Sequence, residues 1–409
     1  MMRANMILRL YEAACRNLTV SADARRDTPL ASLTCRIATD MDDWPRLRGD
    51  WERLYSVTPD VTPWQSWDFL SRWWQTMRGD RLLRIVVVES AGIVQMILPL
   101  QISAMAPLGL RVLEPLGMPD DINRPRLALG MPEATPFAAA LSLLWEHWRD
   151  WDAIRIDEKQ DGDVEVDWLR QFAQSTGSWL AQVPFHACPY LQLHASWNSY
   201  IRSRSPRLMK NLRAARRRLG AMGLVTAERA DEPRDVLRAF DTLISLHERS
   251  WKHVDGVGLS QSESYGRFYR EFVSVKADQR QARAWVLKCD SRPIAATLAF
   301  HQGSTYFSAQ IAHDEAFSHC SPGTLLESIE LEDLMSKGRF HVYDFMGGAL
   351  NNKLRWTSDT RATRRIWCTR PSLRGRVFRL YYFRIKPLLK RMGLFGGVPS
   401  SVTEVHPEN

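Results

Sequence analysis

The chain has 409 residues, of which 45% are hydrophobic and 25% are charged, a composition typical of a globular protein with about two domains. No apolar run approaches the roughly 18 residues that a spanning helix needs, which argues against an integral membrane protein. Six scattered cysteines without a CxxC pair argue against a zinc site and against a disulfide framework. We therefore expect a reduced, cytoplasmic protein that binds no metal.

The net charge of +9 is concentrated in two blocks that contain no acidic residue. Residues 361–391 carry eleven Lys and Arg side chains, and residues 188–227 include the stretch RSRSPRLMKNLRAARRR. Local basic blocks indicate anionic partners at particular places. A phosphate-bearing cofactor, a nucleic acid and a membrane surface all remain candidates from this pattern.

The first half of the chain alternates helical and strand patterns. Residues 1–32 lack the apolar core of a secretory signal and are interpreted as a flexible leader. Two Trp-rich helices follow, and then two apolar runs split by Ala91-Gly92 that are typical of a hairpin. A further helix and strand are predicted over 136–148 and 151–157.

The second half repeats this order. A second hairpin starts at Ala282, about 200 residues after the first hairpin starts at Leu82, which favours two related lobes that meet near residues 185–195. We expect an α/β protein with mixed sheets and two tandem lobes. The expected divisions are a first lobe at 33–188, a second lobe at 189–370 with a helical insertion at 197–275, and a basic amphipathic tail at 371–409.

The stretch CSPGTLLESIELEDLMSKG predicts a helix with a notable start. Ser321 suits the N-cap, Pro322 the first helical position, and Gly323 leaves the first turn bare. Between two strands, such a helix N-terminus offers free N–H groups and a favourable dipole to a phosphate. The alternative interpretation is that Ser-Pro-Gly only begins a helix.

The stretch YDFMGGALNNKLRW follows directly. Alternation along the predicted strand places Asp344 on one face, and Gly347-Gly348 allows a sharp turn. Lys353 then returns to the edge of the same cleft, so this segment could deliver a carboxylate and a cation to one site. A surface turn with solvated charges is the alternative.

Two other helices carry candidate binding residues. In the helix from Ser205 to Gly220, an apolar stripe faces a basic one that includes Arg207, Lys210 and Arg213, with no acid to pair with it. A solvated helix face is the alternative to an anion-binding one. Further on, His247 and Trp251 lie four residues apart on one predicted helix face, where the histidine has either a structural or a substrate-binding role.

The basic tail has two interpretations. Residues 372–391 mix aromatic and basic side chains, and Pro387 would kink a helix there. An amphipathic basic helix can contact an anionic membrane surface, or it can dock on its own domain. GxSxG, HExxH, Walker A and GxGxxG motifs are absent from the sequence, which weakens hydrolase, metalloprotease, NTPase and dinucleotide-enzyme interpretations.

Taken in order, the Trp-rich helices, GIVQMILPL, WNSYIRSRSPRLMKNLRAARRRLG, LHERSWK, the segment from RPIAATLAF to LLESIE, and YDFMGGALNNKLRW resemble a known family. The chain looks like the CelD-like acetyltransferase-domain proteins of the GNAT superfamily, which are related to the Fem peptidyltransferases. The resemblance covers roughly residues 35–370 and implies two GNAT-like lobes and acyl transfer from acyl-CoA to an amine or hydroxyl. It also implies a role in exopolysaccharide or cell-envelope synthesis, with a small-molecule or glycan acceptor.

The resemblance implies roles for individual residues. The CoA pyrophosphate site falls on Ser321, Gly323 and Thr324, with Gln310 nearby, although the usual Gly-rich loop is reduced here to Ser-Pro-Gly. The closing motif falls on Asp344, Gly348 and Lys353. We expect Lys353 to stabilise the tetrahedral oxyanion, and Asp344, followed by Asp314 and His313, to act as the base.

Two other functions compete with this interpretation. A Fem-type transferase would use aminoacyl-tRNA, the one nucleic acid that we consider, and would suit the basic blocks. A non-catalytic GNAT-fold scaffold would dock at the membrane through its basic tail, and the reduced glycine loop slightly favours it.

Overall fold

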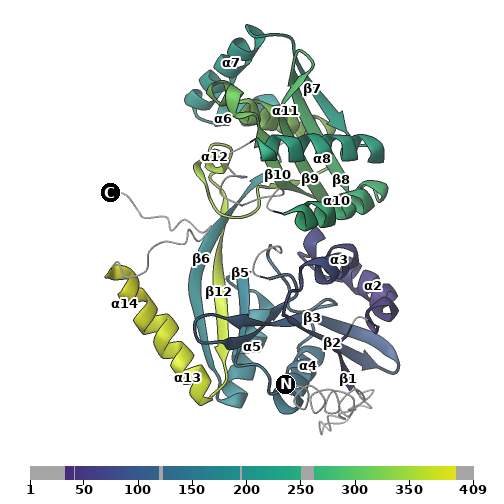
Figure 1. Ribbon diagram of the computed structural model, residues 1–409, viewed down its shortest axis with the longest axis vertical. Coiled ribbons are helices and arrows are strands. Elements are labelled where there is room, and N and C mark those ends of the chain that lie inside the picture. Colours follow the sequence, from purple (N-terminus) through teal and green to yellow (C-terminus); the bar gives the residue numbers. More distant parts are fainter. Residues whose placement is uncertain (1–32, 41, 119–122, 194–195, 250–261, 393–409) are drawn as a thin grey trace. The chain divides into compact units, whose positions relative to one another are not determined.

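The computed structural model describes residues 33–40, 42–118, 123–193, 196–249 and 262–392 (Figure 1). The chain forms two compact units. Within the described residues, the first unit contains those up to Phe185 and those from Thr363 onward, and the second contains His186–Ala362. The leader expected at 1–32 lies outside the described residues.

A mixed sheet forms the centre of the first unit. Its neighbouring strands run in the order β1, β2, β3, β4, β5, β12, and every neighbouring pair is antiparallel except β4 with β5. The bounds are β1 Leu33–Ala38, β2 Leu82–Ser90, β3 Ile93–Met105, β4 Leu110–Pro115, β5 Ala153–Gln160 and β12 Thr360–Thr369. Strand β6, Trp179–Gln192, continues from this unit into the second.

Helices cover this sheet with aromatic and aliphatic side chains. The predicted Trp-rich helices are present, and Trp51, Trp67 and Trp73 are all buried. The helical bounds are η1 Trp44–Leu47, α2 Arg48–Val57, η2 Pro63–Gln65, α3 Trp67–Met77, α4 Ala134–His147, α5 Val164–Thr176, α13 Leu373–Leu380, the π-helical turn η4 Tyr381–Ile385 and α14 Lys386–Arg391.

The second unit has a sheet of the same design. Its order is β7, β8, β9, β10, β11 and then the end of β6, and again only one neighbouring pair, β10 with β11, is parallel. The strands are β7 Val225–Ala230, β8 Ala282–Cys289, β9 Arg292–Gln302, β10 Thr305–His313 and β11 Val342–Asp344. The helices are α6 Trp197–Ser203, α7 Pro206–Gly220, α8 Pro233–Glu248, α10 Glu263–Asp278, η3 Glu315–Cys320, α11 Pro322–Lys337 and α12 Asn351–Leu354.

The two predicted hairpins show that the units repeat one another. β2 and β3 join through Ala91-Gly92, and β8 and β9 join through Asp290-Ser291, one residue earlier than expected. Each hairpin shifts register at the equivalent place, between Val88 and Glu89 and between Leu287 and Lys288. A shared irregularity at one position supports tandem copies of one fold, so the predicted fold class is confirmed.

The last strands of the two copies are exchanged. β12 follows the second copy in sequence, yet it pairs with β5 of the first unit, while the end of β6 pairs with β11 of the second unit. The division of the chain therefore differs from the expected one. Residues from Thr363 onward, including the tail expected as a separate segment from residue 371, belong to the first unit.

The expected helical insertion at 197–275 also differs. It contains strand β7, which pairs with β8 along its whole length from Val225 to Ala230 and forms one edge of the sheet. Polar and apolar residues alternate only over the first four positions of VTAERA, and the segment lies between two strong helical patterns, so sequence periodicity alone did not separate it. The segment is thus an integral part of the second unit.

The basic block at 361–391 is not one continuous patch. Arg361, Arg364, Arg365 and Arg374 form ion pairs with Asp344, Asp161, Asp157 and Asp152. Carboxylates outside the block thus pair with three arginines of its first part and with Arg374 at the start of α13. The second part lies on α13, η4 and α14, whose inner side chains Phe378 and Tyr382 pack against Trp367. Within the described residues, no helix is both long and apolar enough to cross a bilayer.

Candidate functional site

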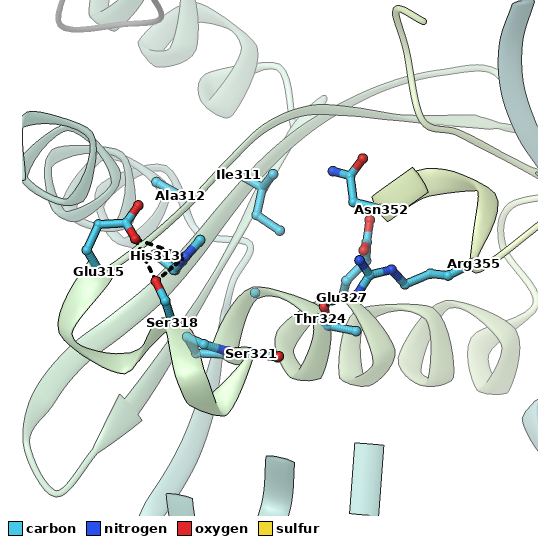
Figure 2. A pocket seen from close by; sticks show the side chains of 12 residues that line it. Ile311, Ala312, His313, Glu315, Ser318, Ser321, Thr324, Glu327, Asn352 and Arg355 are labelled. Atoms are coloured by element: carbon cyan, nitrogen blue, oxygen red, sulfur yellow. Dashed lines mark hydrogen bonds and ion pairs between the residues drawn. The ribbon is translucent and has the colours of Figure 1, made fainter. Parts of the chain in front are cut away.

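A pocket opens in the second unit where two parallel strands separate. β10 and β11 pair only from Thr305↔Val342 to Phe307↔Asp344, where β11 ends. β10 continues to His313 and keeps β9 on one side. On the other side, the last residues of β10 line a cavity of about 300 Å³ together with the start of α11 and residues of α12 (Figure 2).

The first turn of α11 forms the floor of this pocket. Ser321 occupies the N-cap position, as predicted, with a left-handed backbone φ of 52°, but its side chain makes no cap hydrogen bond. Pro322 carries no N–H, so Gly323 and Thr324 hold the N–H groups that have no partner within the helix. A Cβ on Gly323 would lie 3.4 Å from Ile311 Cδ1 and 3.9 Å from His313 Nδ1, so a methyl group fits but a bulky side chain would enter the cavity.

An amide from α12 and a cation from Arg355, the residue that follows this helix, reach the pocket. Arg355 donates from Nη1 to Thr324 Oγ1 at 2.6 Å, and Asn352 also lines the cavity. Figure 2 shows both side chains facing the first turns of α11. A guanidinium, a hydroxyl and two helix N–H groups therefore converge on one cavity, a combination suited to phosphate oxygens.

Glu327 adds a carboxylate to the same pocket and was not selected from the sequence. It is partly buried, and Trp356 donates its indole N–H to Glu327 Oε2 at 2.5 Å. Burial raises the pKa of Glu327 to about 8, against the opposing effects of the Trp356 hydrogen bond and of the Arg355 and Lys353 charges. A carboxylate with a pKa near neutral pH, in a cavity, has the properties of a general base.

One turn further along α11, Glu330 is fully buried. Its carboxylate accepts hydrogen bonds from Tyr306 at 2.6 Å and from Tyr343 at 3.4 Å. Burial raises the pKa of Glu330 to about 7, and its charge also raises the pKa of Glu327. The available sequence signal was two acids on the buried face of a helix otherwise lined by leucines, because buried acids are rare without a partner or a role.

A second polar cluster lies at the other end of the pocket. Ser318 donates to Glu315 Oε2 at 2.6 Å, and His313 Nε2 lies 3.1 Å from Ser318 Oγ (Figure 2). Because the single hydroxyl proton points to Glu315, His313 has to act as the donor to Ser318. The cluster therefore resembles a catalytic triad only in composition, since no base accepts the serine proton in the required direction.

Asp344 and Lys353 are brought together by the loop after β11. Asp344 is fully buried and accepts from Arg361 at 2.8 Å and from the Met346 N–H at 2.9 Å. Lys353 donates from Nζ to the carbonyl of Met346 at 2.5 Å. The segment therefore brings a carboxylate and a cation to one turn, but neither Asp344 nor Lys353 is among the residues that line the pocket. The carboxylate of Asp344 faces an arginine inside the protein.

Asp314 and Gln310 lie close to the pocket without lining it. Asp314 caps η3 through the Ala316 N–H and pairs with Arg292 at 2.6 Å. Burial opposes ionisation of Asp314, but these bonds outweigh it and lower the pKa of the carboxyl group. Gln310 follows the register shift of β10 and pairs with Leu298 of β9.

The predicted substrate-binding residues lie on α7 and α8. The predicted two-sided helix is present in α7: Leu208 and Leu219 are buried, whereas Arg207, Lys210 and Arg213 are exposed. His247 is fully buried near the end of α8. Trp251 lies outside the described residues.

The comparisons with known proteins concern the fold of the chain. The family described as acetyltransferase (GNAT) domain matches residues 206–354, within the second unit. The chain is similar to the crystal structure of FemX, with 12% identity, 81% of this chain and 98% of that chain covered, and a TM-score of 0.55.

A second similar structure is the C-terminal domain of a putative lysylphosphatidylglycerol synthetase from Agrobacterium fabrum. It shares 10% identity over 84% of this chain and 97% of that chain, with a TM-score of 0.51. No curated protein sequence matches the chain. The family match and the two similar structures together identify the fold as that of GNAT-domain acyltransferases.

Proposed function

We propose that this protein is an acyltransferase that moves an acyl group from acyl-CoA to an amine or hydroxyl acceptor. The observation that supports it most is that the first turn of α11 and the Arg355 guanidinium converge on the cavity lined by the last residues of β10. The donor phosphates would bind the N–H groups of Gly323 and Thr324 and the Arg355 side chain. The thioester arm would then lie along Ile311 and Ala312.

The chemistry of transfer suits the remaining residues. The acceptor nitrogen or oxygen attacks the thioester carbonyl carbon, and the resulting tetrahedral oxyanion collapses with cleavage of the carbon–sulfur bond. The acceptor's proton passes to Glu327 and from there to the departing CoA thiolate. Lys353, whose charge is close enough to lower the pKa of Glu327, would stabilise the oxyanion.

In this proposal Glu327 replaces Asp344 as the base. Asp344 is fully buried and holds Arg361 and the backbone of Met346, so its role is to position the loop that carries Lys353. The acceptor would be a small molecule or a glycan. Its place in exopolysaccharide or cell-envelope synthesis is proposed from the likeness of the sequence to CelD-like proteins.

Calorimetric titration with acetyl-CoA and longer acyl-CoAs tests the donor site. We expect Gly323→Trp to abolish binding because its side chain would fill the cavity, whereas Gly323→Ala, whose methyl group fits, should retain it. Circular dichroism controls for folding of both variants. Absence of acyl-CoA binding to the unmodified protein, or binding unaffected by Gly323→Trp, would contradict the proposal.

Aminoacyl-tRNA is a second candidate donor because α7 exposes Arg207, Lys210 and Arg213. No carboxylate among the described residues pairs with these three side chains. The Fem relatives that the sequence resembles use such a donor. Strongly salt-dependent tRNA binding that is lost when the three residues are changed to alanine, without acyl-CoA binding, would favour this donor.

A further inference from the structure

The helical segment Leu373–Met392, which contains α13, η4 and α14, has apolar side chains on two opposite sides. Its inner side is firmly packed in the first unit: Phe378 is fully buried against Trp367, and Phe383 contacts Trp179 with ring centroids 4.8 Å apart. Gly375 is pressed so closely to the chain that a Cβ there would lie 2.3 Å from the Arg370 carbonyl oxygen. These contacts fix which side of α13 faces inward.

The outer side of the segment is also apolar, although the inner side alone suffices to pack the segment against the first unit. Leu373, Val377 and Leu380 follow at helical spacing of four and three residues, and Leu388 and Met392 continue the exposed series on and just beyond α14. These side chains are 78%, 46%, 56%, 56% and 62% exposed, in that order. A helix that only covered its own domain would carry polar residues here.

Basic side chains border this exposed series. Arg376, Arg384 and Arg391 are exposed, and among the described residues no carboxylate pairs with them. On the flanks, Arg379 lies over the Trp179 ring and Lys386 over the Tyr382 ring, at 5.5 Å and 4.9 Å from the centroids. The segment itself contains no acidic residue. Long basic side chains beside leucines can reach lipid phosphates while the leucines enter the acyl region.

The hairpin between β3 and β4 adds to the same region. Residues 105–108 line a hollow of about 90 Å³ with Tyr381, Tyr382 and Lys386, and Leu108 at its edge is 38% exposed. Aromatic side chains next to exposed leucine and lysine are typical of surfaces at the level of lipid headgroups. Figure 1 shows α13 and α14 as one yellow rod along the outside of this unit.

We propose that the outer face of Leu373–Met392 docks the protein on an anionic lipid bilayer surface. The helix would lie in the plane of the headgroups, with Leu373, Val377, Leu380 and Leu388 inserted and the arginines on lipid phosphates. Lipid fits better than a nucleic acid, because a nucleic acid would recognise the arginines but would leave the leucines in water. This proposal is independent of the acyl-transfer proposal, since it rests on the first unit alone.

Co-sedimentation of the full chain with vesicles tests the proposal, using phosphatidylcholine alone and mixed with phosphatidylglycerol. We expect binding to the mixed vesicles only, and weaker binding as salt rises. The variant V377S/L380S should weaken binding by about tenfold or more, and R376Q/R384Q by a similar factor. L224S is a matched control because Leu224 is 71% exposed but lies in the second unit.

Each outcome supports or contradicts docking of this face on a bilayer. All changed positions are exposed, so melting temperatures should stay the same and any loss of binding reports on the surface. Absence of binding to both kinds of vesicle, or binding unchanged in V377S/L380S, would overturn the proposal. Binding of the full chain to RNA that R376Q/R384Q abolishes, with vesicle binding unaffected by that variant, would also overturn it and would identify the face as a polyanion site.

Discussion

Asp344 and Lys353 both hydrogen-bond to the backbone of Met346, one to its N–H group and the other to its carbonyl oxygen. Asp344 accepts the N–H of Met346 at 2.9 Å, and Lys353 donates to the carbonyl of the same residue at 2.5 Å. Met346 has a left-handed backbone with φ of 55°, a costly conformation for a methionine. The two charged side chains therefore stabilise a turn that neither flanking sequence would adopt on its own, and this turn leads to α12 and the pocket.

Lys353→Ala separates catalysis from this structural role. If Lys353 stabilises the oxyanion, acyl-CoA turnover should fall by about 10²–10³-fold, measured well below the melting temperature, while acyl-CoA affinity changes little. The lost hydrogen bond to Met346 should lower the melting temperature only slightly. Lys337→Ala, at the exposed end of α11, is the control and should leave the rate unchanged. A variant whose rate is near normal, or whose loss of rate parallels a loss of stability, would show that Lys353 only holds the turn.

Asp344→Asn should mainly destabilise the protein. It leaves the partly buried Arg361 guanidinium without its carboxylate, and breaking such a pair typically costs about 3–5 kcal/mol. Urea denaturation measures this change in the free energy of unfolding. The double variant Asp344→Asn/Arg361→Gln should recover part of it. A stable single variant that loses only turnover would instead restore Asp344 as the catalytic base.

Glu327→Gln should reduce turnover by about 10²–10⁴-fold without loss of acyl-CoA binding, because the amide cannot accept a proton. The pKa of Glu327 is about 8, so the rate of the unmodified protein should rise with pH through that value as the carboxylate forms. The variant should lack this rise. Glu332→Gln, exposed on the same helix, serves as the control. A pH–rate profile that is the same in Glu327→Gln and in the unmodified protein would exclude Glu327 as the base.

Glu330 should make stability depend on pH. Its pKa is raised from 4.5 to about 7 in the folded protein, so the folded state binds more protons than the unfolded chain between these values. The free energy of unfolding contributed by Glu330 is therefore largest below about pH 4.5 and falls as pH rises through about 7. Glu330→Gln should flatten this part of the pH dependence, measured by urea denaturation across the window. An unchanged slope would contradict the raised pKa.

Local sequence signals predicted much of the fold. Ala91-Gly92 between two apolar runs predicted a hairpin, and Ser205 with Pro206 predicted the start of α7, where Ser205 accepts from the Leu208 N–H at 3.3 Å. These features depend on neighbouring residues, so sequence periodicity and capping suffice. The same holds for the position of Gly323 at the first turn of α11.

Features that depend on distant segments were not predicted. The pairing of β12 with β5 joins Ile366 to Ile156, and no local pattern indicates which strand a final segment will join. The environment of the Glu327 carboxylate is formed by the cavity beside β10 and by Trp356, which follows α12. The ion pairs of the basic block were hidden for the same reason, since Arg364 and Arg365 meet Asp161 and Asp157 from β5 and the turn after it.

The exchange of β12 has a consequence for how the chain folds as it leaves the ribosome. Strand β5 pairs with β4 only at Val112↔Ala153 and Leu113↔Ile154, whereas its pairing with β12 extends from Ala153 to Gln160. The second unit is contiguous in sequence, but the first lacks the strand that secures β5 until synthesis has passed Thr369. The half of the protein that is translated first is therefore the half completed last, and an interrupted message would yield a first unit with an open sheet edge.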